Sequence, residues 1–254
     1  MEGEQMETYT LIPIHLGRML LDMGIMTYRM NYGTKQWMPI ISWYVRAGGK
    51  HVLIDSGISS EVMGRYTETE VEDFTDFETG LKNVGISPLD VDYVIQTHLH
   101  FDHIGNTHRC KNAKVIVQKD EIKFALAPHP MQGYLYDPNL LNDVRLEIVD
   151  GDKEILPGIS VIHLPSHTPG VQAISVNTAQ GKAVISGMCC IGDNFDPPQP
   201  LRGPQQRFHW KVIPPGNFIN LYDAYESALR LKNMADILIP QHDVSLFDVK
   251  QIPA

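Results

Sequence analysis

The chain has 254 residues and a formal net charge of −9, with 43% hydrophobic and 20% charged residues. This balance is typical of a globular protein large enough for one sizeable domain. The basic residues are scattered, which argues against nucleic acid or an anionic membrane as the partner. We expect a cytoplasmic protein acting on a small molecule, because no signal peptide, disulfide framework or long apolar run is evident.

The first half of the chain predicts strands, separated by one or two helices. Apolar runs predict strands at 9–16, 37–45 and 51–55, with hairpin residues between the last two. An acidic segment with apolar residues at helical spacing predicts a helix over 69–84. Buried strands are expected at 92–96 and 114–118, and a helix at 119–127.

The second half repeats this alternation after a polar loop at 128–143. Strands are expected at 145–149, 159–164, 171–177, 183–186 and 237–240, and a helix at 217–234. Six prolines between residues 196 and 215 predict an ordered lid inserted into a single domain that spans 1–254. Strand-rich runs in both halves, with helices between them, favour two packed mixed sheets covered by helices.

The segment THLHFDH, residues 97–103, concentrates four groups that can bind metal. Residues two apart in an extended chain point the same way, so His98 and His100 can face one ion. If a helix begins after Phe101, Asp102 and His103 turn toward the same opening. Imidazole and carboxylate suit zinc, and also iron, manganese or cobalt.

Two further histidines follow the ends of predicted strands. His167 lies in LPSHTPG after the strand at 159–164, and His242 lies in PQHD after the strand at 237–240. The chain could present both at the sheet edge that carries residues 97–103. The remaining histidines, such as His15 and His163, are read as ordinary surface or core residues.

The motif HxHxDH, the SHTPG segment and the PQHD ending resemble the metallo-β-lactamase superfamily, closest to the N-acyl homoserine lactonase and pyridoxolactonase-like group. The resemblance implies an α/β fold, the αββα sandwich of two mixed sheets flanked by helices. It implies two metal ions, most simply zinc, held by ligands His98, His100 and His167, and Asp102, His103 and His242. It also implies that Asp55, in VLIDSG, supports the site from behind the ligands.

One departure concerns the bridging aspartate that the lactonase group places after the strand at 183–186. Here Gly187-Met188-Cys189-Cys190 stands in that place. We expect Cys189 to act as the metal ligand, since thiolate binds zinc well, whereas the Met188 thioether is a poor ligand. Asp193 and the absence of any protein ligand remain open alternatives.

A second departure is the missing tyrosine that polarises the substrate carbonyl in the lactonase group. A residue near the lid, His209, Tyr134 or Tyr136, would replace it, or the metal would act alone. Trp210 and Arg207 are the other candidate substrate-binding residues, the latter for a substrate carboxylate. The packing of these side chains as ordinary structural residues is the competing interpretation.

The predicted function is a metal-dependent hydrolase that opens a small lactone, ester or cyclic amide by attack of metal-bound hydroxide. Asp102 would act as the catalytic residue that moves a proton to the leaving group. The alternatives are a thioester or β-lactam hydrolase, and a mononuclear iron oxidoreductase of the persulfide dioxygenase type. Apolar residues near the N-terminus could serve a homodimer: Met19, Leu20, Leu21, Met23, Ile25 and Met26.

Overall fold

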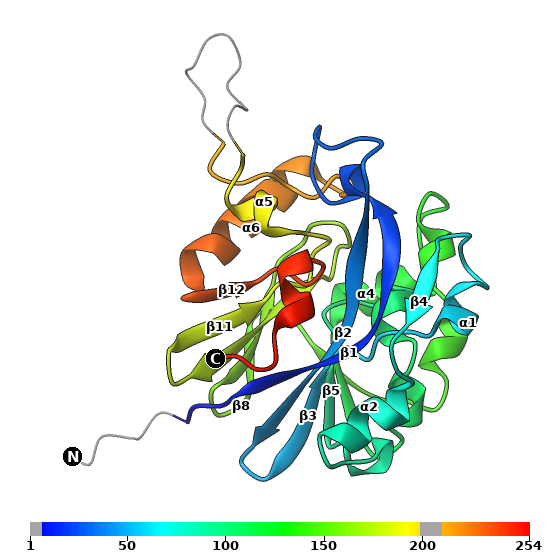
Figure 1. Cartoon of the computed structure of the whole chain (residues 1–254), viewed down its shortest axis with the longest axis vertical. Coiled ribbons are helices and arrows are strands. Elements are labelled where there is room, and N and C mark those ends of the chain that lie inside the picture. Colours follow the sequence, from blue (N-terminus) through cyan, green and yellow to red (C-terminus); the bar gives the residue numbers. More distant parts are fainter. Residues whose placement is uncertain (1–6, 199–209) are drawn as a thin grey trace.

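The computed structural model describes residues 7–198 and 210–254. Two β-sheets face each other, and helices cover the outer face of each one (Figure 1). The larger sheet has seven strands in the order β4 (Val71–Asp73), β1 (Leu11–Asp22), β2 (Lys35–Ala47), β3 (Lys50–Ile54), β5 (Tyr93–Ile95), β6 (Lys114–Gln118) and β7 (Arg145–Val149). The smaller has five: β12 (Ile237–Ile239), β11 (Gly181–Ile185), β10 (Gln172–Thr178), β9 (Ile159–His163) and β8 (Lys153–Leu156).

The helices divide between the two outer faces. The described helices are α1 (Ser60–Met63), α2 (Phe77–Asn83), α3 (Phe101–Ile104), α4 (Lys119–Leu126), α5 (Gly192–Phe195) and α6 (Leu221–Met234). Figure 1 shows α2 and α4 beside the larger sheet and α6 beside the smaller one. The predicted αββα sandwich of mixed sheets is therefore confirmed. Among the described helices, none is long and apolar enough to cross a membrane.

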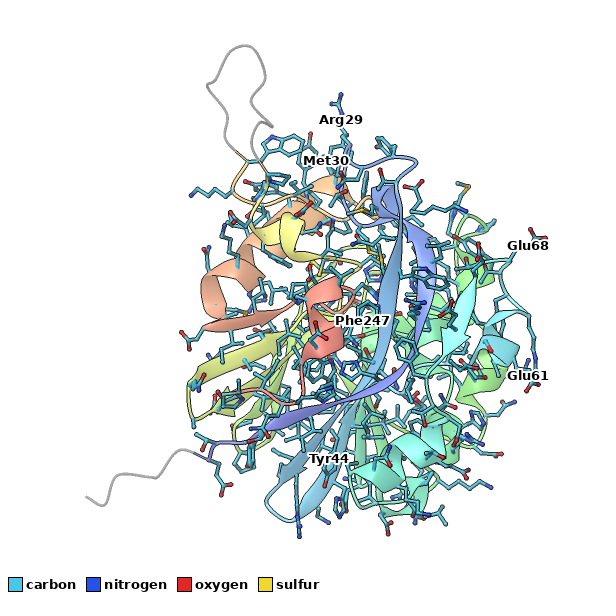
Figure 2. All side chains as sticks on the ribbon, in the orientation of Figure 1. Arg29, Met30, Tyr44, Glu61, Glu68 and Phe247 are labelled. Carbon is cyan, nitrogen blue, oxygen red and sulfur yellow. The ribbon has the colours of Figure 1, made fainter. Side chains whose placement is uncertain are left out.

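Alternating side chains of the strands supply separate apolar layers. In β3, Val52 and Ile54 face the layer between the sheets, whereas Leu53 faces the layer under the helices. Such alternation follows from the two-residue period of a strand. Figure 2 shows side chains filling the space between the sheets, with Glu61 and Glu68 at the periphery. Trp43 is fully buried between the sheets.

The four parallel strands β3, β5, β6 and β7 bring their carboxyl ends to one edge of the larger sheet. Asp55 follows β3 there, and the segment 97–103 follows β5. In the smaller sheet, β11 and β12 are also parallel. Cys189 and His242 follow these two strands, so the topology gathers the predicted site at the junction of the sheets.

The predicted helix over 69–84 is wrong in its first half. Residues Val71–Asp73 form strand β4, which pairs with β1 in the register Gly17↔Asp73 and Met19↔Val71. A Cβ on Gly17 would lie 2.4 Å from the Glu72 carbonyl oxygen, so the glycine permits this close pairing. The helix begins only after Asp76, whose carboxylate accepts a hydrogen bond from the Thr79 amide.

Most of the apolar residues near the N-terminus are buried or half-buried. Met19 and Met26 are buried, and of this set only Ile25 is exposed, by 38% of its surface. Met19, Leu21, Ile25 and Met26 instead line a cavity, so most of this set belongs to the inside of the protein. The remaining strand predictions match strands of the structure, although the run at 9–16 ends six residues before β1 does and β8 was not predicted. The runs at 114–118 and 145–149 match β6 and β7.

Candidate metal centre

The segment after β5 arranges its ligand candidates through a change of conformation. His100 is extended, with φ −65° and ψ 148°, and α3 begins directly after it. His98 and His100 therefore precede the helix, while Asp102 and His103 lie in its first turn. The ring centroids of His98 and His100 are 4.5 Å apart, and those of His98 and His103 4.0 Å apart. The predicted turn into a helix at Phe101 is confirmed.

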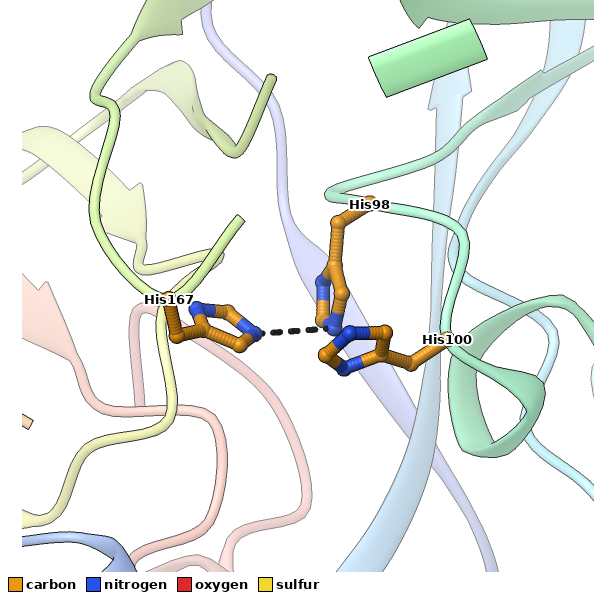
Figure 3. A group of neighbouring side chains, drawn as sticks. All are labelled: His98, His100 and His167. Atoms are coloured by element: carbon orange, nitrogen blue, oxygen red, sulfur yellow. Dashed lines mark hydrogen bonds between the residues drawn. The ribbon is translucent and has the colours of Figure 1, made fainter. Parts of the chain in front are cut away.

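The first group consists of His98, His100 and His167, all buried. One ring nitrogen from each lies within 4.8 Å of the other two. Figure 3 shows His167 reaching toward His98 and His100 from a separate loop. The Nε2 atoms of His98 and His167 are 3.1 Å apart. Three imidazoles converge here from segments about seventy residues apart in the sequence.

The second group consists of Asp102, His103 and His242, again with their ligand atoms within 4.8 Å of one another. His103 Nε2 lies 3.3 Å from an Asp102 carboxylate oxygen. His242 arrives from the loop after β12, and its ring centroid is 5.4 Å from that of His103. The six histidine and aspartate ligand candidates thus divide into two trios, as the family resemblance implied.

The two groups differ in their electrostatics. Burial holds the pKa of His98 and of His167 well below the usual value, and lowers that of His100 to about 3. These imidazoles are neutral, the form that binds metal. Burial acts the same way on His103, but the carboxylates of Asp102 and Asp55 outweigh it and raise its pKa to about 10.

Asp55 stands behind the second group, as expected from its place in VLIDSG. Its carboxylate accepts hydrogen bonds from the Thr97 amide at 2.7 Å and the Thr97 hydroxyl at 2.8 Å. It also accepts one from His103 Nδ1 at 2.7 Å. Asp55 is fully buried and has a positive φ of 56°, a conformation that costs energy in a residue with a Cβ.

The unpaired atoms of the site fit a metal ion. His100 Nε2 is buried and has no hydrogen-bond partner among the described residues. A buried polar atom without a partner costs about 1–3 kcal/mol, unless something else binds it. Together with the facing nitrogens of His98 and His167, it forms a donor set of the kind that zinc and related divalent ions take.

Cys189 lies at the same opening but in neither trio. It lines a cavity of about 280 Å³ together with His100, Asp102 and His242. Burial raises the pKa of its thiol well above the usual value, and the nearby Asp102 carboxylate adds to this effect. The alternatives are placed differently: Met188 is buried in the layer under α6, and Asp193 lies in α5.

The candidate substrate-binding residues are distributed unevenly. Tyr134 is 60% exposed and lines the cavity. Tyr136 is buried, and its hydroxyl donates a hydrogen bond to Glu121 at 3.2 Å. Trp210 stacks on Tyr28, with ring centroids 6.0 Å apart. Arg207 and His209 lie outside the described residues.

The cavity itself has mostly apolar walls. Its described lining carries no lysine or arginine, and the uncharged polar groups are few. Such a wall receives a neutral apolar group more favourably than an ion. The apolar side chains that line it come from β1, the loop after it, α1 and the 128–143 segment: Met19, Leu21, Ile25, Met26, Met63 and Leu135.

Sequence reasoning missed one buried charged residue beside the site. Glu121, in the first turn of α4, is fully buried and accepts a hydrogen bond from the Leu99 amide at 2.9 Å. Gln132 was also missed; its amide donates to the His167 carbonyl oxygen at 3.1 Å. The only available signal was a glutamate at the start of a helix, which is an ordinary surface feature.

Known proteins resemble this chain along most of its length. An N-acyl homoserine lactonase from a Bacillus species is 28% identical over 200 residues, covering 74% of this chain and 78% of that protein. The lactonase AttM from Rhizobium radiobacter is 34% identical over 117 residues, covering 41% of this chain and 43% of that protein.

Solved structures share the fold. An N-acyl homoserine lactone hydrolase, solved with N-hexanoyl-L-homoserine at its catalytic metal centre, matches with a TM-score of 0.76 and 24% identity. That match covers 95% of this chain and 96% of the other. Residues 37–231, which include strands of both sheets and five of the six ligand candidates, match the family model. The chain belongs to the metallo-β-lactamase superfamily.

Proposed function

We propose that this metal-dependent hydrolase opens a neutral lactone or ester that carries an apolar substituent. The observation that supports this most directly is the cavity, which joins members of both ligand trios to aliphatic and methionine walls. The curated relatives of this chain are named N-acyl homoserine lactonases, which agrees with a lactone substrate that carries an apolar substituent. A substrate carboxylate is disfavoured, because no cationic side chain stands among the described residues of the lining.

The two trios would hold two divalent ions, with zinc the best match to their imidazole and carboxylate donors. When bound, such ions supply Lewis acidity toward a carbonyl oxygen and lower the pKa of water toward about 7. His98, His100 and His167 contribute neutral donors, and Asp55 fixes the His103 ring so that its Nε2 faces the centre.

Asp102 is the group we assign to proton transfer. Burial would raise the pKa of its carboxyl, but the neighbouring His103 outweighs this and holds the pKa well below the usual range. The group is therefore ionised at neutral pH, the form that binds metal. It lines the cavity, where it would take a proton from the attacking water and pass it to the departing oxygen of the opened ring.

The substrate walls would come from Tyr134 and from part of the 196–215 segment. Tyr136 is less suited to polarise a carbonyl, since its hydroxyl is already donated to Glu121. The metal alone would then polarise the substrate carbonyl. Arg207, His209 and Trp210 remain candidates for the outer part of the site, on the segment that sequence reasoning assigned to a lid.

The experiment is a lactonase assay on protein stripped of metal and reloaded with zinc. We expect kcat/KM to rise with acyl chain length across γ-lactones that share one ring, because the walls are apolar. Asp102→Asn should lower kcat by about 10²–10⁴-fold, the usual contribution of acid–base catalysis, whereas the exposed control Asp150→Asn should not. Hydrolysis of thioesters or β-lactams in preference to every lactone would refute the proposed substrate, and one iron per chain would favour the oxidoreductase alternative.

We also propose Cys189 as a ligand in the place of the missing aspartate. A thiolate ligand to cobalt gives a sulfur-to-metal charge-transfer band in the near ultraviolet, so protein loaded with cobalt should show this band and Cys189→Ser should lose it. Cys110→Ser and Cys190→Ser are matched controls at buried cysteines that lie outside the ligand cavity, and both should keep the band. A band that persists in Cys189→Ser would exclude Cys189 as a ligand.

A further inference from the structure

The fully buried carboxylate of Glu121 faces hydrogen-bond donors on both of its oxygens. Oε1 accepts from the Leu99 amide at 2.9 Å and from the Tyr136 hydroxyl at 3.2 Å. Oε2 accepts from the Thr168 hydroxyl and from the Gly170 amide at 3.2 Å. No lysine or arginine pairs with it among the described residues, so these four donors are what compensates its burial.

Three of the four donors belong to the segments that carry the first trio. Leu99 stands between His98 and His100, and Thr168 follows His167 directly. One oxygen of Glu121 therefore contacts the first loop, and the other oxygen contacts the second. The carboxylate ties together two loops that are about seventy residues apart in the sequence.

The close approach of the second loop to α4 requires Gly170. A Cβ on this residue would lie 2.1 Å from the Glu121 amide nitrogen and 2.4 Å from the Glu121 Cβ. Any other residue would push the loop, and His167 with it, away from α4. The glycine of the SHTPG segment thus allows the contact that Glu121 makes with the loop.

A third connection runs through Tyr136. Its ring packs edge-on against His100, with centroids 4.9 Å apart, while its hydroxyl donates to Glu121. The same carboxylate thus fixes the ring that supports one ligand of the first trio. None of the hydrogen bonds of Glu121 reaches Asp102, His103 or His242; of these three, His103 is hydrogen-bonded to Asp55 instead.

We propose that Glu121 is a positioning residue for the metal site formed by His98, His100 and His167. It acts on the metal through the two loops and touches neither the metal nor the substrate. Asp55 supports the other site through His103, and it also reaches His98 through the Thr97 hydroxyl, which lies 3.0 Å from His98 Nδ1. Glu121 is therefore the residue whose substitution should affect one site alone. This inference rests on the metal centre of the proposed function but is independent of the substrate.

The test is Glu121→Gln, which keeps the size of the side chain. A glutamine presents an NH₂ group where one carboxylate oxygen accepted two donors, so one of the two loops loses its attachment. We expect the affinity of one zinc ion to fall about 10–100-fold, the usual effect of losing a group that orients ligands, while the other is unchanged. Competition with a chromophoric chelator measures both affinities on metal-free protein, without any substrate.

Cobalt substitution provides a readout that general destabilisation would not move. In Glu121→Gln, the cobalt absorption of the three-histidine site should weaken or shift, while that of the aspartate site stays. Asp55→Asn should change the absorption of the aspartate site most, with a smaller change at the three-histidine site, because Asp55 also holds the Thr97 hydroxyl beside His98. Glu78→Gln is a matched surface control, since Glu78 is exposed and pairs only with Arg109.

If Glu121→Gln fails to fold, Thr168→Val removes a single donor to the same carboxylate and should lower the zinc affinity of the same site by a smaller factor. The proposal is overturned if the zinc affinities of both sites fall equally, or if neither affinity falls. If the wild-type protein binds two ions and Glu121→Gln lowers the affinity of one site only, but no lactone is opened, that result would support the inference about Glu121 and refute only the proposed substrate. Wild-type protein that binds no divalent ion would refute both.

Discussion

Asp55 Oδ2 lies 2.7 Å from His103 Nδ1, in a hydrogen bond between residues that are 48 positions apart. The contact keeps a proton on His103 Nδ1, which donates to the carboxylate and leaves Nε2 as the nitrogen that can bind a metal ion. Nε2 is then directed at Asp102 and the centre of the second trio. Since Asp55 also accepts both donors of Thr97, the ends of β3 and β5 are joined where the ligand segment begins.

Asp55→Asn should lower the affinity of the second trio for its metal ion about 10–100-fold, because His103 loses the carboxylate that orients it. An amide in this place also directs an NH₂ group at buried donors, which should cost about 1–3 kcal/mol of unfolding free energy. Chelator competition and urea unfolding of the metal-free protein measure the two effects. Asp150→Asn, an exposed carboxylate paired with Lys119, is the control and should change neither. Unchanged zinc affinity in Asp55→Asn would mean that His103 is oriented by other contacts.

Trp43 connects the core to the last ligand of the second trio. Its buried indole donates a hydrogen bond to Gln241 Oε1 at 3.1 Å, and Gln241 immediately precedes His242. Trp43→Phe leaves a cavity between the sheets and an amide oxygen without its donor. We expect the free energy of unfolding to fall by about 2–4 kcal/mol, measured by urea denaturation of the metal-free protein.

The matched control is Trp37→Phe. Trp37 is only partly buried and stacks under the Arg18 guanidinium, so its replacement should cost about 1 kcal/mol or less. If the two variants lose equal stability, the buried indole contributes no more than an ordinary aromatic ring. Zinc affinity should fall in Trp43→Phe but not in Trp37→Phe, because Trp43 is hydrogen-bonded to the residue that precedes His242.

The ligand trios could be predicted from the sequence for a local reason. His98, His100, Asp102 and His103 are close in the chain, and the buried strand before them fixes where they emerge. Strands β6 and β7 were predictable as well, since each is a short apolar run between turns with one regular interpretation. His167 and His242 were candidates because each follows a predicted strand, but their assignment to the two trios needed the family resemblance.

Other features depend on contacts between distant segments, which no local pattern reveals. Strand β4 forms because Val71–Asp73 pairs with the edge of β1. This pairing outweighs the helical spacing of the apolar residues in the segment. Glu121 looks like a solvated helix residue in the sequence, and only the two loops that fold over it make it buried. Tyr136 was assigned to substrate because it is aromatic and near the lid, although its hydroxyl is used inside the protein.

The hydrogen bond between Tyr66 and Asp137 should make stability depend on pH in the alkaline range. Burial, together with the Asp137 carboxylate, raises the pKa of Tyr66 to about 12, above the usual 10.0. A folded-state pKa above the unfolded value gives stability that is complete below pH 10 and is lost as the pH rises toward 12. The pKa of Asp137 is lowered by its hydrogen bonds, so its own contribution is lost only in acid, as the pH falls below about 4.

Tyr66→Phe isolates this effect, because the phenylalanine keeps the ring stacked on Phe101, whose centroid lies 5.0 Å away, and removes only the hydroxyl. At pH 7 the variant should be less stable by about 1 kcal/mol, the net value of one hydrogen bond. That difference should shrink between pH 10 and 12, as the wild-type hydroxyl ionises beside a carboxylate. Urea unfolding of both proteins at pH 7 to 11.5 measures it. A difference that stays constant up to pH 11.5 would show that the hydroxyl contributes through packing and not through its proton.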